Sequence, residues 1–397
     1  MRMPGRQFVR IAVAAFVCLS LVSPAALAKT IHFGKSSGKP TGHVFAADAT
    51  TRGGFGDPEN IFAASIAAFR GHIYAGTFNV GVNGAQLFER SGAGWQPVGE
   101  RGFGNPDNTA IEHLFAFHGR LYAGVANFAA GGAIWRSADG ENWEPVAQGG
   151  FGEPINTEMF QFAEFHGKLY VQTTTYDSGE GFQVWTSESG DPGSWEKVVT
   201  NGFDSADNQA GAFAVFGDRL FAGTWNPVTG AQVYATADGT NWTPVESGGF
   251  GSPLNQGINA LEAFQGALYA ATEGPDRSVG EQGAEVWRCR ACDGSDWQRV
   301  VENGFGNPST YELGGLETVA GALVYVVGNT ETGLEVWATL DGTRWAQVDS
   351  AGLGDADNWG TFLDNSIAAI GGRLYIGTWN EIDGGSVYRS RLRVSRR

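Results

Sequence analysis

The feature that most constrains this chain is a unit of about 50 residues that recurs seven times. Each copy carries an apolar-aromatic-small tripeptide, or a close variant, ahead of a sharp turn. The copies are Ile73-Tyr74-Ala75, Leu121-Tyr122-Ala123, Leu169-Tyr170-Val171, Leu220-Phe221-Ala222, Leu268-Tyr269-Ala270, Leu323-Val324-Tyr325 and Leu374-Tyr375-Ile376. Tandem units of this length are typical of a repeat architecture, in which each unit buries the apolar face of its neighbour.

Four short apolar runs in each unit indicate strands rather than helices. They are rich in Val, Tyr, Phe, Trp and Thr and are bounded by Gly, Asp-Gly or Asn. In the clearest copy, strand A ends at Phe216, and strands B, C and D span 219–224, 231–236 and 242–245. Strand B is apolar on both faces, as it must be if sheets pack face to face. We therefore predict an all-β fold, a seven-bladed β-propeller of four-stranded antiparallel blades.

The two ends of the chain complete one blade between them. Residues 43–56 resemble the end of every other unit, whereas the last unit supplies only strands A, B and C, at 366–370, 373–378 and 386–392. We predict that the strand near Val44 and Phe45 pairs with the strand near Val387, which removes an open sheet edge. Residues 29–397 are therefore expected to form a single domain.

An export signal is predicted at residues 1–28. Arg2, Arg6 and Arg10 precede an apolar run from Ile11 to Val22, and a small-x-small pattern ends at Ala28. The run is too short for a typical membrane span, and no later stretch is long and apolar enough for one. The mature chain is expected to be secreted or periplasmic.

The charge of the chain limits its partners. The formal net charge is -16, which becomes more negative once the signal arginines are removed. Such a surface repels nucleic acid and anionic membranes, so we expect neither as a partner, and we expect a monomer. The Arg-rich C-terminal tail is an exception, read either as a solvated end or as a partner-binding segment.

Cys289 and Cys292 are the only cysteines of the predicted mature chain, and they lie in an enlarged turn from Trp287 to Gly294. In an exported protein, a disulfide that closes this turn is the expected state. A redox-active C-x-x-C usually opens a helix, which is not expected here. Two cysteines without a nearby histidine cannot form a zinc site.

Three predicted hairpins share a turn motif. They are Ser137 to Trp143, Thr236 to Trp242 and Thr339 to Trp345, each with Asp-Gly at its centre. This motif resembles the short form of the Asp-box of sialidase-like (BNR-repeat) propellers, where the aspartate binds turn amides and the tryptophan packs beneath. In that family the motif is structural and lies away from the catalytic face. The resemblance therefore implies the architecture and not the activity.

The sialidase-like catalytic pattern is absent from the face expected to be functional. That family holds its acidic sugar with three arginines, whereas Arg70, Arg120, Arg219 and Arg373 fall at or beside A–B turns on the opposite side. The mouth formed by loops D–A and B–C is acidic instead. This argues against sialic acid and uronate substrates and for neutral sugars, a peptide or bound calcium, although no D-x-D-x-D-G loop is present.

Asparagines recur in the loops that converge on this mouth. They are Asn60, Asn108, Asn156, Asn208, Asn255 and Asn358 in the D–A loops, and Asn79, Asn127, Asn226 and Asn380 in the B–C loops. Two interpretations stay open. Such residues commonly bind their own loop backbone, and they could also face a ligand.

Carboxylates interrupt the repeat pattern near the start of strand A. They are Glu112, Glu158, Glu312 and Asp364, with His113, Asn259 and Asn365 beside them. Two carboxyl groups about 5 to 9.5 Å apart could serve as acid and base in glycoside cleavage. The alternative for each is a solvated loop charge.

The leading hypothesis is a secreted binding module that recognises an extracellular neutral glycan or protein. Its predicted ligand-binding residues are Asn79, Asn127, Tyr176, Trp225, Asn226, Glu273, Trp359, Trp379 and Asn380. Among these, Trp225, Trp359 and Trp379 are expected to be exposed and to stack on sugar faces. The second hypothesis is a glycoside hydrolase or polysaccharide lyase that uses Glu112, Glu158 and Glu312. The third is a structural envelope or assembly component without a small ligand.

Overall fold

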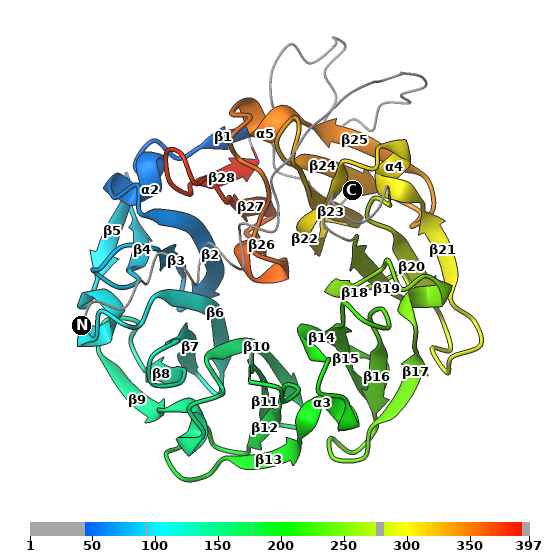
Figure 1. Cartoon of the computed structure of the whole chain (residues 1–397). Coiled ribbons are helices and arrows are strands. Elements are labelled where there is room, and N and C mark those ends of the chain that lie inside the picture. The colour runs from blue at the N-terminus through cyan, green and yellow to red at the C-terminus, as the bar shows by residue number, and fades with distance from the viewer. Residues whose placement is uncertain (1–43, 93, 177, 275–281, 391–397) are drawn as a thin grey trace.

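The computed structural model describes residues 44–92, 94–176, 178–274 and 282–390. The predicted export signal and residues 391–397 of the Arg-rich tail lie outside this part of the chain. The described strands form sheets arranged in a ring (Figure 1), and every pairing between them is antiparallel. The centre of the ring, which the innermost strands face, is called the channel below. No helix within these residues is long and apolar enough to cross a membrane.

The strands follow one another in units of four, the first strand of each unit being innermost. The units are β2 (Asn60–Phe69), β3 (His72–Asn79), β4 (Leu87–Ser91) and β5 (Gly94–Val98); β6 (Ala110–Phe117), β7 (Arg120–Ala126), β8 (Ala133–Ser137) and β9 (Trp143–Ala147); β10 (Glu158–Phe165), β11 (Lys168–Thr174), β12 (Val184–Ser187) and β13 (Glu196–Val199); β14 (Gln209–Phe216), β15 (Arg219–Trp225), β16 (Val233–Thr236) and β17 (Thr243–Glu246); β18 (Gly257–Phe264), β19 (Ala267–Glu273), β20 (Val286–Cys289) and β21 (Gln298–Val301); β22 (Thr310–Val319), β23 (Ala322–Asn329), β24 (Glu335–Thr339) and β25 (Trp345–Asp349); and β26 (Ile367–Ile370), β27 (Arg373–Gly377) and β28 (Val387–Ser390), joined by β1 (Phe45–Ala47).

Single bridges join some neighbouring units. Phe78 pairs with Ala110, and Trp225 pairs with Gly257, so that two pairs of units are linked into eight-stranded sheets. The all-β propeller class is therefore observed. The count of seven blades stays a prediction. The sheets cannot simply be counted as blades, because these bridges merge neighbouring units into single sheets.

The predicted closure of the ring is confirmed. β1 pairs antiparallel with β28, with Phe45 opposite Ser390 and Ala47 opposite Tyr388. The backbone N–H groups of Val44 and Phe45 also donate to Oδ2 of Asp349, at 2.8 and 3.2 Å. The N-terminal strand thus covers the outer edge of the last sheet, which would otherwise expose unpaired backbone groups.

Short segments with helical hydrogen bonds precede most inner strands. They are α2 (Arg52–Gly56), η2 (Arg101–Gly104), η3 (Gly150–Gly152), α3 (Asn201–Asp204), η4 (Gly249–Gly251), α4 (Asn303–Gly306), α5 (Ala351–Gly354) and, just before β26, η5 (Asp364–Ser366). Apart from η5, each contains residues with positive φ, such as Phe103 at 53°. These segments are tight loops, in agreement with the prediction that the units contain no regular helix.

Aromatic stacking accounts for the unusual backbone of these loops. A left-handed conformation costs a non-glycine residue about 1–2 kcal/mol. The strained phenylalanine stacks on an aromatic ring of the third strand of its unit, as in Phe203 on Tyr234 and Phe305 on Trp337, each with ring centroids 3.9 Å apart. Such a pair contributes about 0.5–1.5 kcal/mol beyond its buried area, which offsets the strain.

The Asp-Gly hairpins have the geometry expected from the motif. Oδ1 of Asp139 accepts hydrogen bonds from the backbone N–H groups of Glu141 and Asn142, at 2.9 and 2.8 Å. Gly140 has a φ of 88°, and Trp143 packs on Phe103. The predicted disulfide between Cys289 and Cys292 is also present.

Candidate functional site

β-Bulges in the inner strands set the positions of two polar side chains. In β6, Ile111 pairs with Val125 and His113 pairs with Gly124, which leaves Glu112 as the extra residue. Asn259 has the same place in β18. Because a bulge re-aims the side chain of its extra residue, polar groups can depart here from the alternation of an ordinary strand.

Glu112 and Glu158 form a carboxyl pair between two neighbouring inner strands. Their carboxyl groups are near enough to influence each other electrostatically, and the two residues are 0% and 5% exposed. Burial raises the pKa of both groups, and the charge of Glu158 raises that of Glu112 further. Thr174 Oγ1 donates to Glu158, whereas neither oxygen of Glu112 has a donor among the described residues. Two crowded, buried carboxyl groups of this kind disfavour the state in which both are ionised.

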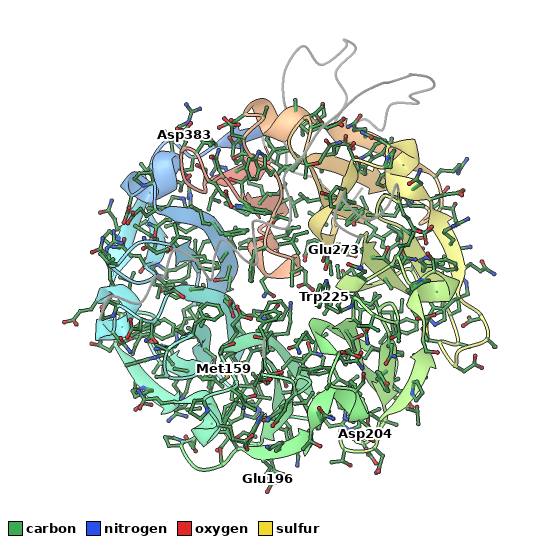
Figure 2. The ribbon with its side chains drawn as sticks, in the orientation of Figure 1. Met159, Glu196, Asp204, Trp225, Glu273 and Asp383 are labelled. Atoms are coloured by element: carbon green, nitrogen blue, oxygen red, sulfur yellow. A yellow bond between two sulfur atoms is a disulfide. The ribbon has the colours of Figure 1, made fainter. Side chains whose placement is uncertain are left out.

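Glu273 lies at the end of β19, close to Trp225 and Asn259. Burial raises the pKa of Glu273 to about 7, and the nearby amide of Asn259 opposes this shift. Gly257 separates the three side chains: a Cβ atom there would lie 2.9 Å from Trp225 Cδ1 and 3.1 Å from Glu273 Oε2. Figure 2 shows Trp225 and Glu273 at the inner edge of the ring. Trp225 is half-buried, so part of its ring stays accessible.

Tyr176 is the exposed aromatic residue of this cluster. It lies in the loop between β11 and β12 and is 43% exposed. Partial removal from water raises the pKa of its phenol well above the usual value, and the charges of Glu158, Glu112 and Glu273 raise it further. Tyr176 is therefore within electrostatic reach of all three carboxyl groups. These residues, with Trp225 and Asn259, are called the mouth cluster below.

The loop asparagines bind one another and their own loops. Nδ2 of Asn156 donates to the carbonyl of Gly150 at 2.9 Å, and the equivalent bond recurs in Asn60, Asn108, Asn208, Asn255 and Asn358. Nδ2 of the B–C asparagines in turn donates to Oδ1 of these residues, in the pairs Asn79–Asn60, Asn127–Asn108, Asn226–Asn208 and Asn380–Asn358. All ten side chains are buried. This arrangement supports the structural interpretation of Asn79, Asn127, Asn226 and Asn380.

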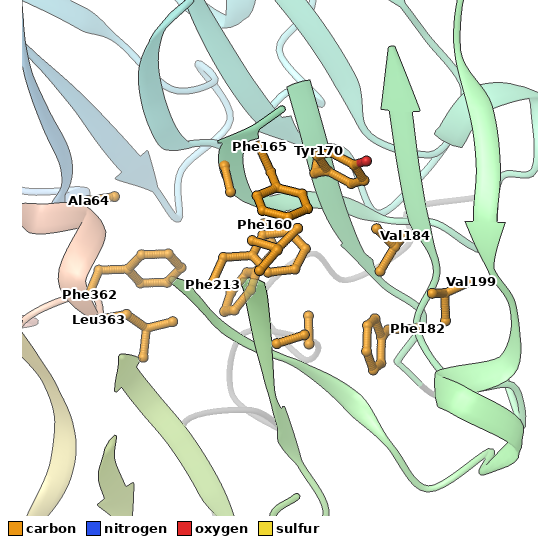
Figure 3. Close-up of a cluster of buried hydrophobic side chains, with 14 of the residues drawn as sticks. Ala64, Phe160, Phe165, Tyr170, Phe182, Val184, Val199, Phe213, Phe362 and Leu363 are labelled. Carbon is orange, nitrogen blue, oxygen red and sulfur yellow. The ribbon is translucent and has the colours of Figure 1, made fainter. Parts of the chain in front are cut away.

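Trp379 is not exposed, contrary to the sequence-based expectation. It is 4% exposed and stacks on Phe62 with ring centroids 5.0 Å apart. Trp359 is partly buried and meets Trp379 edge to face. Both are held inside because the segment 358–365, an insertion in the last unit, turns into the channel. There Phe362 and Leu363 project towards Phe160 and Phe213 (Figure 3).

Two predictions about chemistry at the mouth, catalysis by Glu312 and a bound calcium ion, are not supported by the described side chains. Glu312 lies on β22, opposite Gly328, but its side chain lies outside the described part of the structure. Within the described residues, no group of three or more His, Cys, Asp or Glu side chains is arranged to hold a metal ion.

The comparisons with solved structures identify similar folds. A family PL25 polysaccharide lyase, an ulvan lyase bound to -[GlcA(1-4)Rha3S]-, is 10% identical with a TM-score of 0.50, over 84% of this chain and 92% of that one. Penicillium chrysogenum alpha-L-arabinanase complexed with arabinobiose is 12% identical with a TM-score of 0.48, over 70% and 91%. Trypanosoma rangeli sialidase is 13% identical with a TM-score of 0.43, over 76% and 56%. At these identities the likeness concerns the fold alone.

A search of curated proteins found no match. The family model described as the DUF6242 beta propeller domain matches residues 150–351. Since this stretch is just over half of the chain, the protein belongs to the DUF6242 beta propeller domain family.

Proposed function

We propose that this protein is an exported β-propeller that binds a neutral glycan at the mouth cluster. The observation that carries the proposal is the exposed ring of Tyr176 near three buried carboxyl groups whose pKa values are raised above the usual range. An aromatic ring offers a flat apolar face to a sugar. Carboxyl groups beside it offer hydrogen bonds to the hydroxyl groups of the same sugar.

The protonation of the cluster favours a neutral ligand. A protonated carboxyl group both donates and accepts hydrogen bonds, as a sugar hydroxyl does. Glu273, with a pKa of about 7, has this double capacity when protonated, and the raised pKa values of Glu112 and Glu158 act in the same direction. An anionic sugar would raise the cost of ionising any of these groups, since like charges repel in a partly buried site.

Binding to soluble neutral polysaccharides tests the proposal. In affinity gel electrophoresis with arabinan, galactan, mannan and xylan, we expect at least one of them to retard the wild type. Tyr176→Ala should weaken that binding at least about tenfold, because stacking and hydrogen bonding to one sugar unit are lost. Phe128→Ala is the matched control: Phe128 is 41% exposed on the equivalent loop of the preceding unit.

The binding results distinguish the proposed glycan binding from its alternatives. Failure to bind any neutral polysaccharide, or equal binding by Tyr176→Ala and wild type, would overturn the proposal. The first result would favour a protein ligand or an assembly component without a small ligand. Export is tested separately, by the mass of the mature chain, which should begin at Lys29.

Glycoside cleavage is the second candidate, and Glu273 is the residue that favours it. A group with a pKa of about 7 can serve as a general acid at neutral pH. Release of reducing ends by the wild type, abolished in a folded Glu273→Gln variant, would establish an enzyme; binding without product would establish a binding module.

A further inference from the structure

A second site lies deeper in the channel, towards the A–B turns. A cavity of about 240 Å³ is lined there by His113, Gln161, Glu262, Glu317, Asp364 and Asn365, together with apolar side chains. Glu262 and Glu317 have equivalent positions, two residues before the last residue of β18 and of β22. Asp364 comes from the insertion 358–365. None of these six residues belongs to the mouth cluster.

The three carboxyl groups of the cavity have neutral hydrogen-bond donors. The backbone N–H of Thr318 donates to Glu262 at 3.1 Å, the N–H of Ala369 donates to Glu317 at 3.3 Å, and Gln161 Nε2 donates to Asp364 at 2.9 Å. The described residues that line the cavity include no Lys or Arg. The negative charges of the cavity therefore have no protein cation among these lining residues.

His113 does not supply the missing positive charge. Burial lowers the pKa of His113 to about 3, so the imidazole is neutral. Its Nδ1 accepts a hydrogen bond from the backbone N–H of Phe162 at 3.0 Å, which places the hydrogen of the neutral ring on Nε2. Burial raises the pKa of Glu317 to about 8 and of Asp364 to about 7, and the charge of Glu262 contributes to both shifts. This is the behaviour of crowded carboxyl groups without a counter-ion.

Asn365 gives an independent indication of a ligand that donates hydrogen bonds. It lines the cavity at 5% exposure, and its Nδ2 donates to the carbonyl of Phe160 at 3.1 Å. Its Oδ1 has no hydrogen-bond partner among the described residues. A buried acceptor without a donor is unfavourable, and a bound donor would remove this cost.

We propose that this cavity binds a small aliphatic diamine. A primary ammonium group carries three donors and no acceptor, which suits a set of carboxylates and an amide oxygen. Phe162, Phe213 and Leu316 line the same cavity and can contact the methylene chain between two ammonium groups. The volume suits a short ligand, because sites for drug-sized molecules occupy about 300–1,000 Å³.

Calorimetric titration of the full chain with putrescine at pH 8 tests this inference. We expect binding of one putrescine per chain, and at least about tenfold weaker binding by Glu317→Gln with Asp364→Asn, because two charge-assisted hydrogen bonds are lost. Glu164→Gln is the matched control. Glu164 lies near the same end of the inner strand β10, but it is exposed and does not line the cavity. If the double variant has an altered melting transition, Glu317→Gln alone is used, with the same expected direction.

Other probes distinguish the alternatives. 1,4-Butanediol, which has the same chain length without charge, should not bind. Three results would each overturn the proposal: absence of putrescine binding, equal binding by the wild type and the Glu317→Gln, Asp364→Asn variant, or a heat of binding with calcium chloride alone. Because the glycan test uses Tyr176 at the mouth and this one uses Glu317, each can fail without the other.

Discussion

Gln161 donates through Nε2 to Oδ1 of Asp364 at 2.9 Å, and so joins two segments that are 203 residues apart in the chain. Gln161 belongs to the inner strand β10, and Asp364 to the insertion 358–365. The neighbouring bond from Asn365 to the carbonyl of Phe160 spans 205 residues. The insertion thus enters the channel and contacts inner strands on its far side, where Figure 1 shows the chain before β26 reaching inward.

The apolar part of this insertion should contribute strongly to stability. Phe362 is 8% exposed and meets Phe62 and Phe160 edge to face. We predict that Phe362→Ala lowers the free energy of unfolding by about 3–5 kcal/mol, because the buried contacts are lost and a cavity remains. Urea unfolding followed by tryptophan fluorescence measures this. Val228→Ala, at a position 64% exposed, should change it by less than about 0.5 kcal/mol; equal effects would contradict the packing described.

Ring closure by the N-terminal strand predicts a strict truncation boundary. Deletion of residues 29–52 removes β1, including Phe45, which is 4% exposed. We expect a loss of at least about 3–5 kcal/mol, since the phenylalanine contacts alone have that magnitude. Deletion of residues 29–43 retains β1 and serves as the control. A full deletion that melts at the same temperature as the control would refute the closure.

The asparagine network predicts that Asn156 contributes more to the free energy of unfolding than the size of its side chain suggests. Asn156 donates to Gly150 and Gln183 and accepts from Thr173, at 2.9, 3.0 and 2.9 Å. Asn156→Ala should lower the free energy of unfolding by about 1–3 kcal/mol for each buried group left without a partner. Asn142→Ala, in an exposed hairpin, should have a much smaller effect. A ligand-binding role alone would instead leave the stability of Asn156→Ala unchanged.

The raised pKa of Glu317 predicts a pH-dependent stability. Its pKa rises from 4.5 to about 8 on folding, so between these values the folded state binds more protons than the unfolded state. Stability from this group is complete below about pH 4.5 and decreases as the pH rises towards 8. Glu317→Gln should therefore raise the melting temperature more at pH 8 than at pH 4.5. A shift that is the same at both pH values would contradict the burial of this carboxyl group.

Only part of the candidate site could be predicted from the sequence. Glu112, Glu158 and Asp364 could be selected because they depart from the repeat pattern near the start of strand A. Tyr176 and Glu273 were selected because they lie in the converging loops. Glu262, Glu317 and Gln161 were missed. Each lies within a strand whose sequence pattern is otherwise ordinary, so no local signal separates a side chain that faces the channel from one that faces water.

The local repeat was sufficient to determine the architecture of this protein. Recurring tripeptides, Asp-Gly turns and short apolar runs act within about 50 residues, so they specify the strands, the hairpins and the completion of the last sheet by the N-terminal strand before the ring is formed. The burial of Trp379, the electrostatic coupling of Glu112 to Glu158 and the entry of residues 358–365 into the channel were decided by the tertiary structure alone. They depend on residues from different blades, whose distances are set only when the ring closes, and the protonation of the buried carboxyl groups follows from that closure.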